Sequence, residues 1–297
     1  MICFIVNPAA GSGKAKAAVS VIEDVMRERG AEYSVIFTQA PGDHERIAKQ
    51  IDSNAVKTIV CVGGDGTVQE YVGLAVRRDV NFSIIPAGSA NDLLYSVPGS
   101  VRDFRTFEEK IAFYAKKVLD GRIINADIVA VNGDRHFFNI GGTGIDIEVL
   151  KGALPLKKTF GGAAYFISLI KNAVTYRAEE MTLTVDGVAE TTRFLLLAVC
   201  NGAYYGGNLN IAPPAVIDDG LITLCKVKKM PRLKLMALFP LVKPGKHTKL
   251  KEVSFLNCEE VKLEYSGKKT INFDGNLYEF ESPLTFRILK GAVRLIV

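Results

Sequence analysis

The sequence lacks several features that would assign a chain to a class at once. It has five cysteines, an odd number, and none of them forms a C-x-x-C pair. Three of them (Cys3, Cys61 and Cys200) lie in apolar runs that are typical of strands. We therefore expect reduced thiols in the core rather than a disulfide framework, and a cytosolic compartment.

Long apolar segments are also missing. Met1 is followed directly by ICFIV, without the basic region and cleavage site of a signal peptide. No apolar stretch approaches the roughly 20 residues that span a bilayer. We expect a soluble chain that can still touch a membrane surface.

The composition is that of a folded protein with a mild preference for anions. Hydrophobic residues make up 48% and charged residues 23% of the chain. The net charge is +5, which favours nucleotides, anionic lipid surfaces or nucleic acid as partners. A length of 297 residues predicts two domains, with one large α/β unit as the alternative.

The first third alternates between strand-like and helix-like segments. Apolar runs rich in β-branched residues lie at 2–6, 33–38, 58–62 and 82–86, and helical patterns separate them. Strands that are apolar on both faces predict a parallel sheet covered by helices, a Rossmann-like α/β domain. Ligands bind such sheets at the carboxyl ends of the strands, where NPAAGSGK, GGDGT and PAGSAND all fall.

The remainder of the chain is rich in β-strand patterns. Asn132-Gly133 and Asp186-Gly187 predict hairpin turns, and one helix is expected at 163–176. We predict an α/β domain over 1–125 and an all-β sandwich over 126–297, whose last strand packs back toward the first domain. We find no internal repeat and no low-complexity linker, so the site is expected in the cleft between the two domains.

The three loops differ in how specific they are. GSGK departs from the complete P-loop because Ala15 follows Lys14, so a flexible turn and an anion site both remain open. In GGDGT, three glycines let backbone amides approach phosphate oxygens while Asp65 approaches a metal or a hydroxyl. PAGSAND repeats this design after the next strand, and two such loops on adjacent strands indicate a phosphate site.

Together these motifs resemble the diacylglycerol kinase catalytic family of bacterial lipid kinases, which are related to sphingosine and ceramide kinases. GGDGT by itself is shared with NAD kinases and phosphofructokinases, whereas the pair PAGSAND and DDGLITL is specific. The resemblance covers nearly the whole chain: it includes Asp127, FNIGGTGID at 138–146, GKHTKL at 245–250 and FDGN at 273–276. It implies an NAD kinase-like fold with ATP and Mg²⁺ as cofactors.

The resemblance also implies which residues bind these cofactors. In the family the Mg²⁺ is held through a D-G-L turn, here the carbonyls of Val216 and Leu221 with the carboxylate of Asp219; from the residues alone, this turn is also compatible with a simple hairpin. Taken with the three loops, the expected ATP-binding set is Asn7, Lys14, Thr38, Gly63, Gly64, Asp65, Gly66, Thr67, Val68, Gln69, Gly88, Ser89, Asn91 and Asp92.

The expected catalytic end of the site departs from the family. Members carry D-G-E near the C-terminus, with the glutamate as proton acceptor, and this chain has Asp274-Gly275-Asn276. An asparagine cannot accept the proton. We therefore expect Asp274 to act as the base, with Asp65 helping to neutralise charge around the γ-phosphate and Asn276 at the position of the missing carboxylate.

A basic segment is the candidate for membrane contact. Nine Lys/Arg residues and no acid lie between Lys226 and Lys251, around the apolar run LKLMALFPLV. This composition is typical of an interfacial contact, although a solvated face over a core helix gives the same pattern. We expect charge reversal of Lys228, Lys229 and Lys234 to weaken binding to anionic vesicles. No nucleic-acid module is recognisable, so nucleic acid is not expected as a partner.

The sequence thus predicts an ATP-dependent lipid kinase that phosphorylates diacylglycerol or a related lipid, cytoplasmic and peripheral to the inner face of the membrane. Two alternatives remain: a catalytically weakened nucleotide- or lipid-binding protein, and a GGDGT kinase of a soluble acceptor such as NAD. The identity of the lipid and the oligomeric state are open, and a homodimer is compatible with the sequence.

Overall fold

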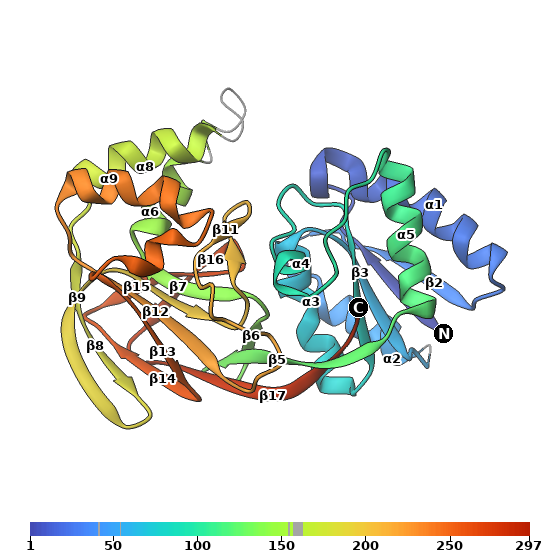
Figure 1. Cartoon of the computed structure of the whole chain (residues 1–297). Coiled ribbons are helices and arrows are strands. Elements are labelled where there is room, and N and C mark those ends of the chain that lie inside the picture. Colours follow the sequence, from blue (N-terminus) through green and yellow to red (C-terminus); the bar gives the residue numbers. More distant parts are fainter. Residues whose placement is uncertain (41, 54, 154, 157–162) are drawn as a thin grey trace.

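The structure is a computed structural model of the chain, and it describes all residues except 41, 54, 154 and 157–162. Figure 1 shows two lobes that are connected by long strands running along one side of the molecule. The first lobe is α/β and the second is predominantly β, as the sequence predicts.

The first lobe is built on a parallel sheet in the order β4-β3-β1-β2. Its strands are β1 (Ile2–Val6), β2 (Tyr33–Phe37), β3 (Thr58–Gly63) and β4 (Asn81–Pro86). Its helices are η1 (Ala10–Gly13), α1 (Lys14–Glu28), α2 (His44–Asp52), α3 (Asp65–Arg78), α4 (Leu93–Ser96) and α5 (Phe107–Asp120).

Alternation along the strands explains why helices cover both faces of this sheet. Cys3 and Ile5 of β1 pack into the core cluster that contains α2 and α3 residues. Phe4 and Val6 point the other way, into the cluster that contains α1 and α5 residues. Because successive side chains of a strand point to opposite faces, a continuous apolar run needs cover on both sides, so the predicted architecture is confirmed.

The second lobe is a β-sandwich with helices on one side. Its strands are β5 (Ile123–Val131), β6 (Arg135–Phe137), β7 (Ile140–Gly144), β8 (Glu179–Val185), β9 (Val188–Cys200), β10 (Tyr204–Tyr205), β11 (Leu209–Asn210), β12 (Ile222–Lys228), β13 (Val253–Cys258), β14 (Glu260–Glu264), β15 (Lys268–Phe273), β16 (Asn276–Glu281) and β17 (Leu284–Ile296). Its helices are α6 (Ile145–Ala153), α8 (Ala163–Thr175), α9 (Arg232–Val242) and η2 (Lys246–Lys249). The two predicted hairpin turns are confirmed, because β5 pairs with β6 and β8 with β9 around them.

The lobes share one sheet. β17 pairs antiparallel with β5 from Phe286↔Val131 to Ile296↔Ile123, and its end pairs parallel with β4 of the first lobe. All the described strands except β10 and β11, which form a separate pair, therefore make one continuous 15-stranded sheet that runs through both lobes. A division after residue 125 stays a prediction, and it falls within β5.

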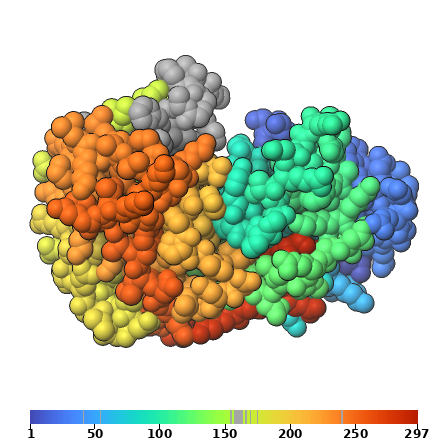
Figure 2. Space-filling view, viewed as in Figure 1, coloured from blue at the N-terminus to red at the C-terminus, as the bar shows by residue number. Residues whose placement is uncertain are grey.

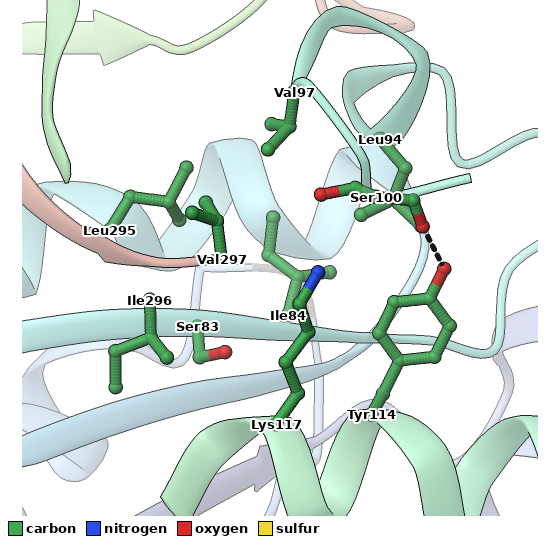
Figure 3. A pocket seen from close by; sticks show the side chains of 10 residues that line it. All are labelled: Ser83, Ile84, Leu94, Val97, Ser100, Tyr114, Lys117, Leu295, Ile296 and Val297. Carbon is green, nitrogen blue, oxygen red and sulfur yellow. Dashed lines mark hydrogen bonds between the residues drawn. The ribbon is translucent and has the colours of Figure 1, made fainter. Parts of the chain in front are cut away.

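The C-terminus is fixed in the first lobe. The backbone amide of Val297 donates to the carbonyl of Arg122 at 2.9 Å. Close by, the Tyr114 hydroxyl of α5 donates to the carbonyl of Ser100. Figure 3 shows Leu295 to Val297 around a small cavity beside α5. Its volume of about 10 Å³ leaves room for about one water molecule, so it fits no organic ligand.

Candidate functional site

Three glycine-containing loops meet at the carboxyl edge of the first-lobe sheet. A Cβ atom on Gly88 would lie 2.3 Å from the Cα of Gly64, so these two backbones touch directly. A Cβ on Gly11, whose φ is +60°, would lie 2.0 Å from the carbonyl oxygen of Ala87. Only glycine permits these approaches. NPAAGSGK, GGDGT and PAGSAND are therefore packed into one cradle, as the sequence predicts.

The N-terminus of α3 faces this cradle. Thr67 lies in its first turn and accepts a hydrogen bond from the Asn7 side-chain amide at 3.3 Å. Asn7 also accepts from the backbone amide of Ala9 at 3.1 Å. Gly64 is the N-cap and supplies no side chain to cover the first amides of the helix. These amides and the helix dipole favour an anion at this point.

Asp65 links two of the loops. Its Oδ1 accepts from the backbone amide of Leu93 at 3.1 Å. Burial raises the pKa of this carboxyl, and the amides of Asn91 to Leu93 oppose that shift. Asn91, with φ of +56°, bonds through its side chain to both the amide and the carbonyl of Gly88. Asp65 and Asn91 therefore hold the shape of the cradle.

Asp92 joins the cradle to the second lobe. Its carboxylate is buried and accepts from the amides of Gly207, at 3.0 Å, and Asn208. Burial, with a smaller contribution from the charge of Asp65, raises the pKa of Asp92 to about 6. Asp92 therefore positions the lobes relative to each other.

Asp274 lies in the turn between β15 and β16, on the second-lobe side of the site. Its two carboxylate oxygens accept from the backbone amides of Phe138 at 2.8 Å, Asn139 at 3.1 Å and Ile140 at 2.7 Å. Burial, together with the charge of Asp65, raises the pKa of Asp274 to about 7, although the amides oppose the shift. The charge of Asp65 in the first lobe thus makes a small contribution to the raised pKa of Asp274 in the second.

Asn276 contacts the GGDGT helix directly. A Cβ on Gly66 would lie 3.2 Å from Asn276 Oδ1, and Asn276 Nδ2 donates to Gln69 Oε1 at 2.8 Å. The same Gln69 oxygen accepts from the Tyr278 hydroxyl at 3.0 Å, and Gln69 Nε2 donates to the carbonyl of His136 at 3.1 Å. The Gln69 side chain is therefore committed to contacts with the second lobe.

Sequence reasoning missed Tyr278 and His136 as members of this network. Tyr278 had a signal, because it follows Asn276 by two positions on a strand and so lies on the same face. His136 contributes only its backbone carbonyl, and because every residue type has one, the sequence gives no sign of this contact.

The other expected ATP-binding residues surround the cradle. Thr38 is half-buried, and its amide donates to the carbonyl of Val6 at 2.9 Å. Lys14 and Ser89 are exposed, whereas the Val68 side chain is part of the core and leaves only its backbone for a ligand.

Comparison with known families covers nearly the whole chain. Residues 1–131 match the diacylglycerol kinase catalytic domain, and residues 140–297 match the YegS C-terminal NAD kinase beta sandwich-like domain. The chain belongs to this family of lipid kinases. Membership makes it a phosphotransferase and implies that ATP is the phosphate donor.

Curated relatives match this chain over nearly its full length. A probable lipid kinase YegS-like from Xanthomonas campestris pv. campestris is 30% identical over 91% of this chain and 88% of its own. A diacylglycerol kinase from Mycobacterium tuberculosis is 28% identical over 97% of this chain and 91% of its own. A solved structure named "A putative diacylglycerol kinase from Bacillus anthracis str. Sterne" has the same fold, with a TM-score of 0.79, 23% identity and coverage of 99% of this chain and 96% of that one.

The D-G-L turn of this lipid kinase is rigidly held. Asp127 is buried and accepts from the amide of Gly220 at 2.6 Å and the amide of Gly291 at 2.7 Å. Asp219 Oδ1 accepts from the amide of Leu221 at 2.9 Å. Burial raises the pKa of Asp219, and the charges of Asp127 and Asp218 add to the shift, so a cation would be favoured here.

A pocket of about 190 Å³ lies beside the GGDGT helix, between α2, α3, the β5–β6 hairpin and β16. Its lining mixes apolar residues such as Ala48 and Leu74 with charged and polar ones, among them Glu70, Arg77 and Arg135. The guanidinium of Arg135 lies over the Tyr278 ring, 4.6 Å from its centroid.

Proposed function

We propose that the protein transfers the γ-phosphate of ATP to the hydroxyl of diacylglycerol or a related lipid. The observation that carries this proposal is the glycine cradle, in which Gly11, Gly64 and Gly88 bring three loops together in front of the second lobe. The acceptor oxygen forms a bond to the γ-phosphorus while the bond to the bridging oxygen breaks and ADP leaves. Phosphoryl transfer needs mainly positioning and charge neutralisation, which backbone amides and a helix N-terminus provide.

Mg²⁺ is part of this proposal, and the residues present fit it. No group of three or more His, Cys, Asp or Glu side chains is placed to hold a metal in the described part of the chain. The D-G-L turn instead offers the carboxylate of Asp219 with the carbonyls of Val216 and Leu221. Oxygen ligands in small number suit Mg²⁺, which keeps several waters. Bound there, the ion would supply positive charge near the site.

Asp274 is the proposed proton acceptor. Three backbone amides orient its carboxylate, and the Asn139 amide is shared between the two oxygens, at 3.1 and 3.2 Å. Its pKa of about 7 is close to the pH at which a base works best. Asn276 holds Gln69 instead of accepting the proton.

The base assignment predicts a pH dependence. Because burial raises the pKa, Asp274 is protonated at low pH, so kcat/KM should rise with a slope of about 1 up to pH about 7 and then level off. Asp274→Asn should lower kcat by at least about 100-fold and remove this slope. Melting curves and ATP binding are measured on the same variant. A folded, ATP-binding variant that keeps the wild-type rate and slope contradicts the assignment.

The substrate class is tested directly. The protein is incubated with radiolabelled ATP, Mg²⁺ and a panel of diacylglycerol, phosphatidylglycerol and a polyprenol in mixed micelles, with NAD as a soluble acceptor. We expect label in a lipid and none in NAD. Label in NAD alone, or ATP binding without transfer to any acceptor, would reject the lipid kinase proposal.

A further inference from the structure

Helices α8 and α9 form a partly apolar surface on the second lobe. Figure 1 shows them side by side above the β-sandwich. Leu233 of α9 is 83% exposed, and Met236, one turn further, is 37% exposed. Ile167 and Ile170, also one turn apart on α8, are 39% and 37% exposed.

The two faces of α9 have different roles. Leu235, Leu238 and Val242 are buried in a core cluster of the second lobe, so one face of the helix packs inward. Leu233 has no such role, because most of its side chain is in solvent. One face of the apolar run LKLMALFPLV therefore belongs to the core, and the interfacial contact stays a prediction for the exposed face.

The cations around this surface fall into two groups. Lys226 and Lys228 pair with Glu190, and Lys234 pairs with Glu252 at 2.6 Å. No ion pair within the described residues neutralises the others in the segment, which are Lys229, Arg232, Lys243, Lys246, Lys249 and Lys251. Of the three lysines expected to bind the membrane, Lys228 and Lys234 thus have acidic partners within the fold and Lys229 has none among the described residues, and their role in vesicle binding stays a prediction.

The surface lies on the side where the lobes separate. Figure 2 shows a notch between the two lobes that opens on the side of α8 and α9, and the segment containing the PAGSAND loop borders it. A surface that touched a bilayer there would turn the notch toward the lipid.

We propose that the α8–α9 surface, defined by Ile167, Ile170, Leu233 and Met236, docks the protein on an anionic bilayer. Leu233 enters below the head groups, and Lys229 and Arg232 lie at the level of the lipid phosphates. Exposed apolar side chains beside unpaired cations match the boundary between head groups and acyl chains. This inference rests on the proposed lipid kinase function, because a lipid substrate is the reason for the protein to dock on a bilayer. In the described part of the chain, no helix is long and apolar enough to cross a membrane.

The test is co-sedimentation with vesicles of phosphatidylcholine containing about 30% phosphatidylglycerol, without ATP. Leu233→Asp should lower the partition coefficient by about 10-fold, and adding Lys229→Glu and Arg232→Glu should lower it by about 100-fold. Val188→Asp with Lys49→Glu and Lys116→Glu is the matched control, since it makes the same change in net charge, and Val188 is also an exposed apolar residue, at 74%, but lies in the β8–β9 hairpin. The control should bind within about twofold of wild type.

Two further measurements separate this inference from the proposed function. The triple variant should lose activity on vesicles but keep it on a water-dispersed short-chain diacylglycerol. Wild-type vesicle binding through this surface without lipid phosphorylation would reject the kinase proposal and leave docking intact. Unchanged vesicle binding by the triple variant overturns the docking proposal. So does a stable dimer in light scattering that becomes monomeric with Leu233→Asp, because the surface is then covered by a second copy.

Discussion

Replacing Gly88 by alanine should lower kcat/KM for ATP by at least about 100-fold. The new Cβ would lie 2.3 Å from the Cα and 2.9 Å from the amide nitrogen of Gly64, and neither backbone atom can move aside as a side chain would. The PAGSAND and GGDGT loops must then separate by about 1 Å, and a displacement of this size in a positioning site costs about 100-fold. ATP titration of the initial rate measures the loss.

Gly73→Ala is the control for this variant. Gly73 lies in α3, and a Cβ there would meet only His136 Nδ1 at 3.3 Å, a side-chain atom that can shift. We expect its rate to stay within about threefold of wild type, because alanine is also the better helix former. Equal rates for Gly88→Ala and Gly73→Ala, with both proteins folded by circular dichroism, would show that the loop contact does not shape the site.

Asp146→Asn should stabilise the protein at pH 8 by about 2 kcal/mol and at pH 5 by about half as much, since the unfolded carboxyl is already ionised at pH 5. The residue as a whole is only partly buried, but its Oδ1 is inaccessible and has no hydrogen-bond partner among the described residues. Tyr205 donates to the other oxygen at 3.2 Å. Burial raises the pKa of Asp146 to about 6 from 3.8, because the charged form is poorly solvated.

The sign of the pH dependence follows from this shift. A raised pKa means that the folded state holds the proton more tightly than the unfolded chain between pH about 4 and about 6. The stability contributed by Asp146 is complete below its unfolded pKa and is lost as the pH rises through about 6. Asparagine carries no charge and avoids that loss.

Urea denaturation at both pH values measures the difference. Asp24→Asn is the control, since the Asp24 side chain is 72% exposed and pairs only with Arg27. It should change the free energy of unfolding by less than about 0.5 kcal/mol at either pH. An equal effect of Asp146→Asn at pH 5 and pH 8 would mean that its charge is not the cause.

Much of the fold could be predicted because it depends on short sequence patterns, namely apolar runs and turn residues. Continuous apolar runs such as TIVCV require cover on both faces, and the Asn-Gly and Asp-Gly turns fix hairpin registers. The positions of the three glycine loops also followed, because the carboxyl ends of parallel strands meet at one edge of the sheet.

Side-chain partners could not be predicted in the same way. Gln69 is separated by 207 residues from Asn276, and nothing between them in the sequence indicates that the two amides bond. The ion pairs of the basic segment could not be predicted either. The sequence shows its nine cations, but Glu190 of β9 and Glu252, just before β13, reach three of them only because the chain packs that way.

By itself, the sequence determined that three glycine loops follow strands of the first sheet and that position 276 carries an amide where the family has a carboxylate. Both follow from residue types at fixed spacings, so they do not depend on how the two lobes are arranged. Only the tertiary structure decided that Asp274 is held by three amides near Asp65, that Gln69 faces the second lobe, and that Leu233 is left in solvent. These depend on contacts between residues far apart in the chain, whose geometry is set by packing the two lobes around one shared sheet.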